Sequence, residues 1–291
     1  MGKTVGKLFE KYLDKFEKEL LRAINTEDEE AIHDLRVSIK KMRALFLFLS
    51  EAGIANIKSD YRYFRKLKDI FKKAGKLREF HIHKNLLEKY RQRTGEDFPS
   101  LAHYLEEQEK AARQEWHDLM PGLKLRKLYH TADQLHKIIE GVPPKKLNHK
   151  LYGFVKSRVD ECYDFMFEPH YENHLHQIRK YLKHIRFIIG QKIGSIHKRF
   201  DNEIDFSDTK KVEDILGEWH DRDEFRKFLD EFYNQLDNTG QDEVSETYQS
   251  FRNEVAKDIQ EDIKTLRPEL VHLFSLMKNI LEQHPKPPTK A

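Results

Sequence analysis

Two eleven-residue segments share one pattern of charged side chains. HDLRVSIKKMR (residues 33–43) and HQIRKYLKHIR (residues 176–186) both read H-x-x-R-x-x-x-K-x-x-R, and they lie 143 residues apart. Spacings of three, four and seven residues return to the same face of an α-helix, so each segment aligns its charged side chains in one stripe. Arginine suits phosphate oxygens through its planar fork, and lysine supplies a mobile point charge. The pattern predicts two copies of an anion-binding helix.

Apolar residues indicate where each stripe lies on its helix. On a helical wheel, His33, Arg36, Lys40 and Arg43 span an arc of about 80°, beside an apolar arc of about 100°. His176, Arg179, Lys183 and Arg186 have the same relation to their own apolar neighbours. Each stripe should therefore flank the buried face, where partial desolvation strengthens the attraction for phosphate and packing lowers the entropy cost of binding. Lys41 and His184 lie farther round and are expected to be secondary contacts.

The elements that must position these stripes are helices throughout, because apolar residues recur every three or four positions and no strand pattern is convincing. In the first half the pattern predicts helices over residues 5–24, 26–50, 58–74, 78–93, 99–120 and 124–139. In the second half it predicts helices over residues 147–167, 171–189, 208–216, 220–236, 241–265 and 268–283. Glycines or prolines separate most of these segments, and Val142-Pro143-Pro144 is the best linker.

A second repeated segment indicates a duplication. GKLREF (residues 75–80) has its counterpart in GEWHDR (residues 217–222), 142 residues later. Two motifs in the same order at nearly equal offsets favour a tandem repeat of one helical bundle. We expect residues 1–144 to form the first bundle, residues 145–283 the second, and residues 284–291 a disordered tail. Two such bundles would pack most simply about a pseudo-twofold axis, with both stripes lining one groove.

Composition narrows the class of protein. The 291 residues carry a net charge of +3, but residues 58–78 hold nine Lys/Arg against two Asp, whereas residues 201–262 hold twenty acids against seven bases. Such asymmetry indicates a polarised surface that attracts polyanions on one side. A mean hydropathy of −0.81, the lack of an apolar signal core and a single cysteine, Cys162, favour a soluble cytoplasmic protein with no membrane span and no internal disulfide.

With these motifs the chain resembles the conserved histidine α-helical domain (CHAD) family over nearly its whole length. The resemblance implies two four-helix bundles around a basic cavity or pore, and binding of inorganic polyphosphate. Carried over position by position, it implies these anion contacts: His33, Arg36, Lys40, Arg43, Arg78, His176, Arg179, Lys183 and Arg186.

The chain departs from the family at its glycine-containing turns, which usually read L-G-x-x-R-D. The first copy has Ala74-Gly75 followed by Arg78-Glu79, and the second has Leu216-Gly217 but His220 where arginine is usual. His220 is therefore expected to be a weaker, pH-dependent contact. The full set of secondary contacts is Lys41, Arg62, Arg65, Lys72, Lys73, His184 and His220.

Other chemistries fit the residues less well. The sixteen histidines offer metal binding as an alternative, but His81 and His83 do not share a helical face and no HExxH motif is present. We expect neither a metal nor a cofactor. Asp221 and Glu79 lack a partnering nucleophile and are interpreted as carboxylates that orient nearby cations. A phosphohydrolase would need a carboxylate cluster for metals or a glycine loop for phosphate, so we expect no enzymatic activity.

The remaining choice is between two polyanions. Sites for single-stranded nucleic acids pair a basic track with aromatic platforms, and neither stripe interleaves aromatic residues. This favours long-chain polyphosphate, with association with polyphosphate granules as a further expectation, and leaves a nucleic-acid-binding adaptor, or binding of other phosphate polyanions, as the alternative. Because histidine has a pKa of about 6.5, we expect His33 and His176 to make binding tighter at pH 6 than at pH 8.

Overall fold

The computed structural model describes residues 2–26, 28–54, 57–119, 125–201, 203–204, 206–237 and 245–283. This part of the chain is all-α, with ten α-helices, one short 3₁₀-helix and no strand. Every helix in it is too short or too polar to span a lipid bilayer. The predicted tail, residues 284–291, lies outside the described residues.

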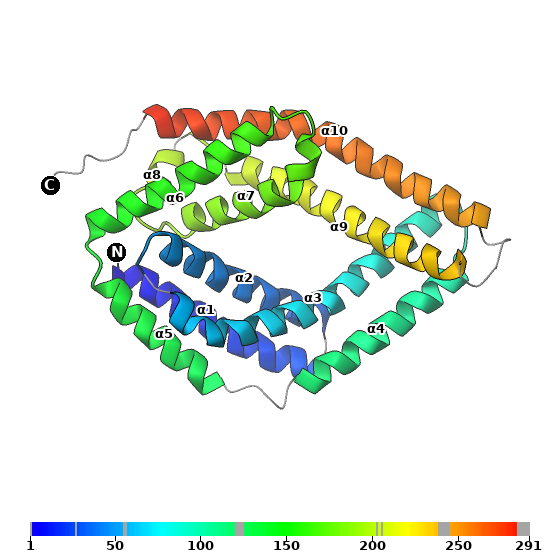
Figure 1. Ribbon diagram of the computed structural model, residues 1–291, viewed down its shortest axis with the longest axis horizontal. Coiled ribbons are helices and arrows are strands. Elements are labelled where there is room, and N and C mark those ends of the chain that lie inside the picture. Colours follow the sequence, from blue (N-terminus) through cyan, green and yellow to red (C-terminus); the bar gives the residue numbers. More distant parts are fainter. Residues whose placement is uncertain are drawn as a thin grey trace.

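Five helices form the first half of the chain. They are α1 (Gly2–Thr26), α2 (Glu29–Glu51), α3 (Ile57–Thr94), α4 (Pro99–Leu119) and α5 (Leu125–Glu140). The second helix packs against α1 and α3, while α5 packs on α1 and α4 on α3. In Figure 1, α4 and α5 form the lower edge of the molecule and α2 and α3 run through its centre.

The second half contains α6 (Pro144–Phe165), the 3₁₀-helix η2 (Tyr171–His174), α7 (Leu175–Gly190), α8 (His197–Phe200), α9 (Phe206–Asp237) and α10 (Ser245–Gln283). Here α7 packs against α6 and α9, and α10 packs against α6 and α9. The long α10 forms the upper edge of the molecule in Figure 1.

One apolar core runs through both halves. It includes buried residues from α1 to α10, and α2 contacts both α6 and α7 while α3 contacts α9. Aromatic pairs cross between the halves, with ring centroids 5.4 Å apart for Phe48 and Phe154 and 5.7 Å apart for Tyr12 and Phe187. The two halves therefore share buried apolar surface, and α2 contacts α7 directly.

Three helices are longer than the sequence pattern predicts. The predicted breaks at Gly75 and Gly217 lie inside α3 and α9, and the predicted gap before residue 268 lies inside α10. By contrast, Gly53 and Gly95 have φ values of +64° and +74°, and helices do end there, as predicted. The helix continues through Pro268 because packing on both sides holds it, with Leu266 and Leu270 fully buried.

Candidate anion-binding site

The structure brings the two cationic stripes together. Helix α2 carries the first stripe, α7 carries the second, and the two helices contact each other. The positive charge of Lys40 lies close enough to Lys183 and Arg179 for their repulsion to lower its pKa. The positive charge of Arg179 likewise acts to lower the pKa of Arg36 across the same contact. Residues that are more than 130 positions apart in the chain thus form one positively charged cluster.

Lys40 has the most strongly altered environment in this cluster. Burial among protein atoms lowers its pKa to about 7, and repulsion from Lys183 and Arg36 acts in the same direction. Its side chain nevertheless remains exposed to solvent. Lys40 is therefore a recessed lysine that water still reaches. Close to neutral pH, this lysine is uncharged in a large fraction of the protein molecules.

The other central cations are also destabilised by their surroundings. Burial and the nearby Arg179 lower the pKa of Lys183 to about 8. Burial lowers the pKa of Arg36 to about 10, and burial likewise lowers the pKa of Arg179. An anion placed among these four groups would remove repulsion that the fold itself creates.

One carboxylate, Asp221 on α9, is shared by the cations of both halves. Burial raises the pKa of Asp221, whereas Arg179, Arg78, Lys183 and Lys40 act to lower it. Two of these four cations come from the first half and two from the second. Asp221 is thus a central counter-charge, in keeping with its interpretation as a carboxylate that orients nearby cations.

Phe71 and Gly75 of α3 hold the first stripe in place. The Nη1 atom of Arg36 donates a hydrogen bond of 2.7 Å to the carbonyl oxygen of Phe71. The guanidinium groups of Arg36 and Arg43 lie 4.3 and 5.1 Å from the centroid of the Phe71 ring. A Cβ atom on Gly75 would lie 2.3 Å from Arg36 Nη1, so only glycine leaves room for this guanidinium.

The sequence pattern predicts a turn at Gly75 and gives Phe71 no role in the site. The signal that could have found them is their spacing, because residues four positions apart on a helix share a face. A glycine one turn after an aromatic residue marks a place where another side chain can approach the helix closely.

Arg78 and the outer members of the stripes have individual partners. Arg78 forms an ion pair with Glu29 of α2, and Arg186 forms one with Glu213 of α9. His33 is exposed, and its pKa is lowered by partial burial and by the charge of Lys40. His33 is therefore largely neutral at pH 7.

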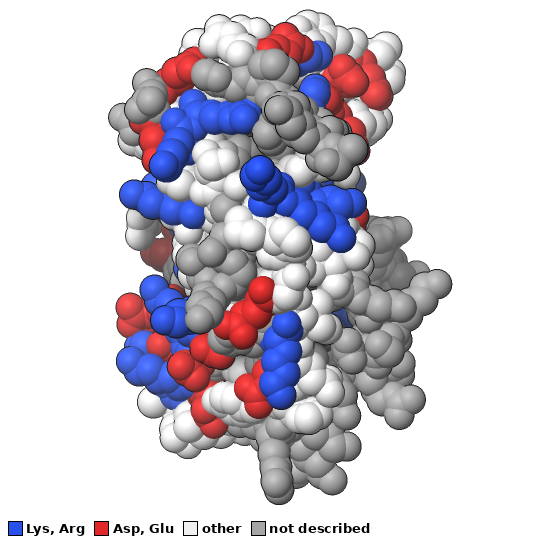
Figure 2. Space-filling model, turned by 90° about the vertical axis from the view of Figure 1, so that its left-hand side faces the viewer, with Lys and Arg blue, Asp and Glu red and all other residues white. Residues whose placement is uncertain are grey.

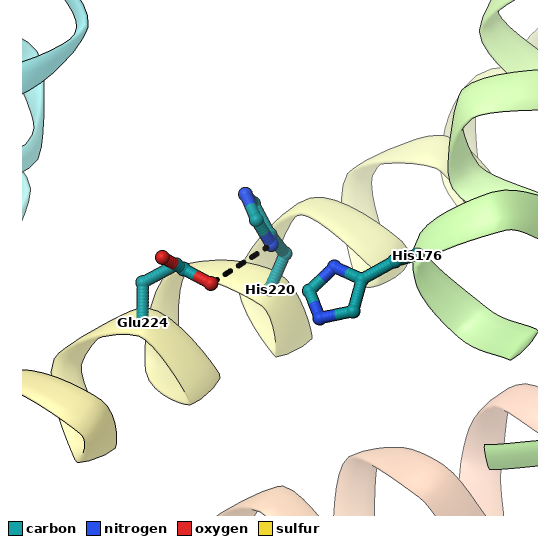
Figure 3. A group of neighbouring side chains, drawn as sticks. All are labelled: His176, His220 and Glu224. Carbon is teal, nitrogen blue, oxygen red and sulfur yellow. Dashed lines mark ion pairs between the residues drawn. The ribbon is translucent and has the colours of Figure 1, made fainter. Parts of the chain in front are cut away.

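His176 and His220 meet at the N-terminal end of α7. Their ring centroids are 5.1 Å apart, and Figure 3 shows both rings beside Glu224. Burial and the charge of Arg179 lower the pKa of His220 to about 3, so this ring is neutral at physiological pH. Its expected role as a weak, pH-dependent cation would thus require a strongly acidic medium.

The secondary residues predicted from the sequence do not all join the central cluster. Lys41 faces α1, where its Nζ lies 5.5 Å from the centroid of the Tyr12 ring. Lys73 contacts Glu115 of α4 at 3.2 Å, and Lys72 lies near the same carboxylate. His184 accepts a long hydrogen bond of 3.5 Å from Arg158. The side chains of Arg62 and Arg65 lie outside the described residues.

Comparisons with known proteins agree with this architecture. A family model described as the CHAD domain matches residues 7–230, well over half of the chain. The chain belongs to the CHAD domain family. A crystal structure of the CHAD domain from the plant Ricinus communis superposes with a TM-score of 0.65 and covers 93% of this chain and 91% of its own. At 13% sequence identity, that likeness establishes a shared fold. None of the curated proteins compared with this CHAD domain matches it.

Proposed function

We propose that this protein binds inorganic polyphosphate, preferably long chains, on the surface where α2 and α7 meet. The observation that carries the proposal is the contact between α2 and α7, which brings together Lys40 and Lys183 from different halves while Lys40 remains open to solvent. Bringing like charges together costs free energy, and a bound polyanion offsets that cost. Membership of the CHAD family, for which the sequence resemblance implies polyphosphate as ligand, supports the same reading.

The pattern of helix contacts supports a shared groove between two repeats. Helix α2 packs on α1 and α3, and α7 packs in the same way on α6 and α9. We take α6, α7 and α9 as the second copies of α1, α2 and α3, in line with the repeated sequence motifs. A polymer that contacts both stripes at once is held by each at a high effective concentration for the other.

The surroundings of the first stripe favour a ligand without nucleobases. Phe71 is an aromatic residue that touches the first stripe, and its ring is covered by Arg36 and Arg43. A ring occupied by two guanidinium groups is not free to stack on a nucleobase, which sites for single-stranded nucleic acids require. We therefore favour polyphosphate over the nucleic-acid-binding adaptor, and a role in binding without hydrolysis, in the cytoplasm or at polyphosphate granules.

Removal of the central cations tests the site. The α2 double variant (Arg36→Ala, Lys40→Ala) and the α7 double variant (Arg179→Ala, Lys183→Ala) should both weaken binding of labelled long-chain polyphosphate. Figure 2 shows several groups of Lys and Arg on the left-hand side of the molecule, so non-specific attraction needs a matched control. The control double variant (Lys145→Ala, Lys146→Ala) removes two exposed cations from the start of α6 and should bind as the wild type does.

Competition with single-stranded RNA of matched charge separates the two candidate functions. We expect RNA to displace labelled polyphosphate only at much higher phosphate concentration. Equal competition by RNA would favour the nucleic-acid-binding adaptor, and equal losses in all three double variants would mean that binding depends on overall charge alone.

A further inference from the structure

We propose that His176, His220 and Glu224 form a binding site for a divalent transition-metal ion such as Zn²⁺. Each side chain offers one ligand atom, and these atoms all lie within 4.8 Å of one another. His220 and Glu224 are one helical turn apart on α9, and His176 approaches them from α7 (Figure 3). This proposal concerns the metal alone and does not rest on phosphate binding.

The donor set fits the chemistry of such an ion. Two imidazoles and one carboxylate are a known set of protein ligands for zinc that leaves a fourth position open, and imidazole also suits copper and nickel. The Nδ1 atom of His220 and the Oε1 atom of Glu224 are 4.0 Å apart. With bonds of about 2.0–2.2 Å, two ligand atoms of a tetrahedral ion lie about 3.3–3.6 Å apart, so this pair must move closer by about 0.5 Å. All three ligand atoms already lie within 4.8 Å of one another, so side-chain rotation can bring them around one ion.

The imidazole of His220 offers a ligand atom that the protein leaves unsatisfied. Its Nδ1 atom is buried and has no hydrogen-bond partner in the described part of the chain. A buried nitrogen without a partner carries a desolvation cost that coordination to a metal would remove.

Residues around the cluster fix the orientation of His176. Its Nε2 atom lies 3.3 Å from a carboxylate oxygen of Asp223, and its ring packs on Trp219 with centroids 4.8 Å apart. A carboxylate behind a histidine is a common feature of metal sites, where it sets the tautomer and raises the basicity of the ring. Asp223 is itself anchored by Lys227 at 2.8 Å.

Nearby cations oppose a divalent ion, and they also give the proposal a sensitive test. His220 lies near the positive charges of Arg179, Lys183 and Lys227. The Nζ atom of Lys227 lies 2.7 Å from Glu224 Oε1. The negative charges of Glu224 and Asp223 partly offset them. Lys227 is long and about half exposed, so it can turn away from Glu224, but its charge should weaken metal binding.

The experiment is a titration of the full chain with Co²⁺, followed by its visible absorption and reversed by Zn²⁺, with isothermal calorimetry for stoichiometry. We expect one equivalent to bind. Asp223→Asn should weaken binding by about 10–100-fold, and His220→Ala should weaken it by more. Lys227→Ala should tighten it, which a merely structural role of these residues would not produce.

A matched control is available on α4, where His103 and Glu107 form another exposed histidine–glutamate pair one turn apart, at 3.5 Å. His103→Ala should leave the titration unchanged. If His220→Ala fails to fold by circular dichroism, Glu224→Gln takes its place. An absence of saturable binding, or a cobalt spectrum that survives the loss of His220 or Glu224, overturns the proposal.

Discussion

Binding of polyphosphate should take up protons, and the uptake should grow with pH. In the free protein the pKa values of Lys40 and Lys183 are about 7 and 8, and a neighbouring phosphate favours the charged form of both. At pH 6 both lysines are already charged, and the expected uptake is only about 0.1 proton. At pH 8 about 0.9 of Lys40 and about half of Lys183 are neutral, so the expected uptake is about 1.4 protons.

The coupling between proton uptake and binding also determines how far the affinity for polyphosphate falls as the pH rises. A cation with a lowered pKa must be recharged before it can bind an anion, so affinity falls as pH rises through that pKa. Between pH 6 and pH 8 the two lysines together predict a decrease of about 20-fold, of which Lys40 supplies about tenfold. Solvent reaches Lys40 and screens part of the repulsion, which makes 20-fold an upper bound.

Calorimetry in buffers of different ionisation enthalpy measures the uptake directly, since the observed enthalpy varies with the buffer in proportion to the protons transferred. Long chains keep the fraction of titrating terminal phosphates small. Lys40→Gln should remove most of the uptake at pH 8, whereas the control double variant should keep it. Equal uptake at pH 6 and pH 8, or an unchanged value in Lys40→Gln, would refute the reasoning.

Three further outcomes are expected. Long-chain polyphosphate should lose much more affinity than tripolyphosphate in both the α2 and the α7 double variants, because a short chain occupies one stripe only; equal losses in an affinity series against chain length would contradict a shared groove. A Cβ atom at Gly217 would meet no atom within 4 Å, so Gly217→Ala should raise the free energy of unfolding by about 0.5–1 kcal/mol in a denaturation assay. Gly75→Ala instead displaces the Arg36 guanidinium and should lower the affinity for polyphosphate in a binding assay. His83 is fully buried, with its pKa lowered to about 3, so the unfolded chain binds more protons between pH 3 and about 6.5; stability should fall as pH drops through that window, and less steeply in His83→Phe.

Local periodicity accounts for what the sequence predicted well. It placed α2 and α7 with their stripes beside the buried face, because the three- and four-residue spacing of apolar and basic residues acts within one helix. It failed at Gly75 because a glycine after a helical run usually ends the helix, whereas here it admits Arg36 from another helix. The positive φ values of Gly53 and Gly95 do end their helices, and single-sequence reasoning cannot separate these two uses of glycine.

The site itself depends on contacts between distant parts of the chain. Nothing in the spacing of either stripe says that Lys40 should face Lys183, or that one carboxylate, Asp221, should serve both halves. The same holds for the pH response, which the sequence assigned to His33 and His176. Burial lowers the pKa of His33 further from neutrality and brings that of Lys40 close to it, so the lysines carry the expected response.

The position of Asp221 has a consequence for which anions can enter. An anion with a single charge gains the attraction of the surrounding cations but meets the negative charge of Asp221, and much of the gain is cancelled. A polymer with many charges engages Lys40, Arg179 and Lys183 together, while it meets the same single carboxylate once. The repulsion from Asp221 is the same for every ligand, whereas the attraction to the cations grows with the charge of the ligand. Only ligands above a certain charge therefore gain free energy by binding. Chloride and other small anions of the cell would then leave the site open, and only densely charged chains would occupy it.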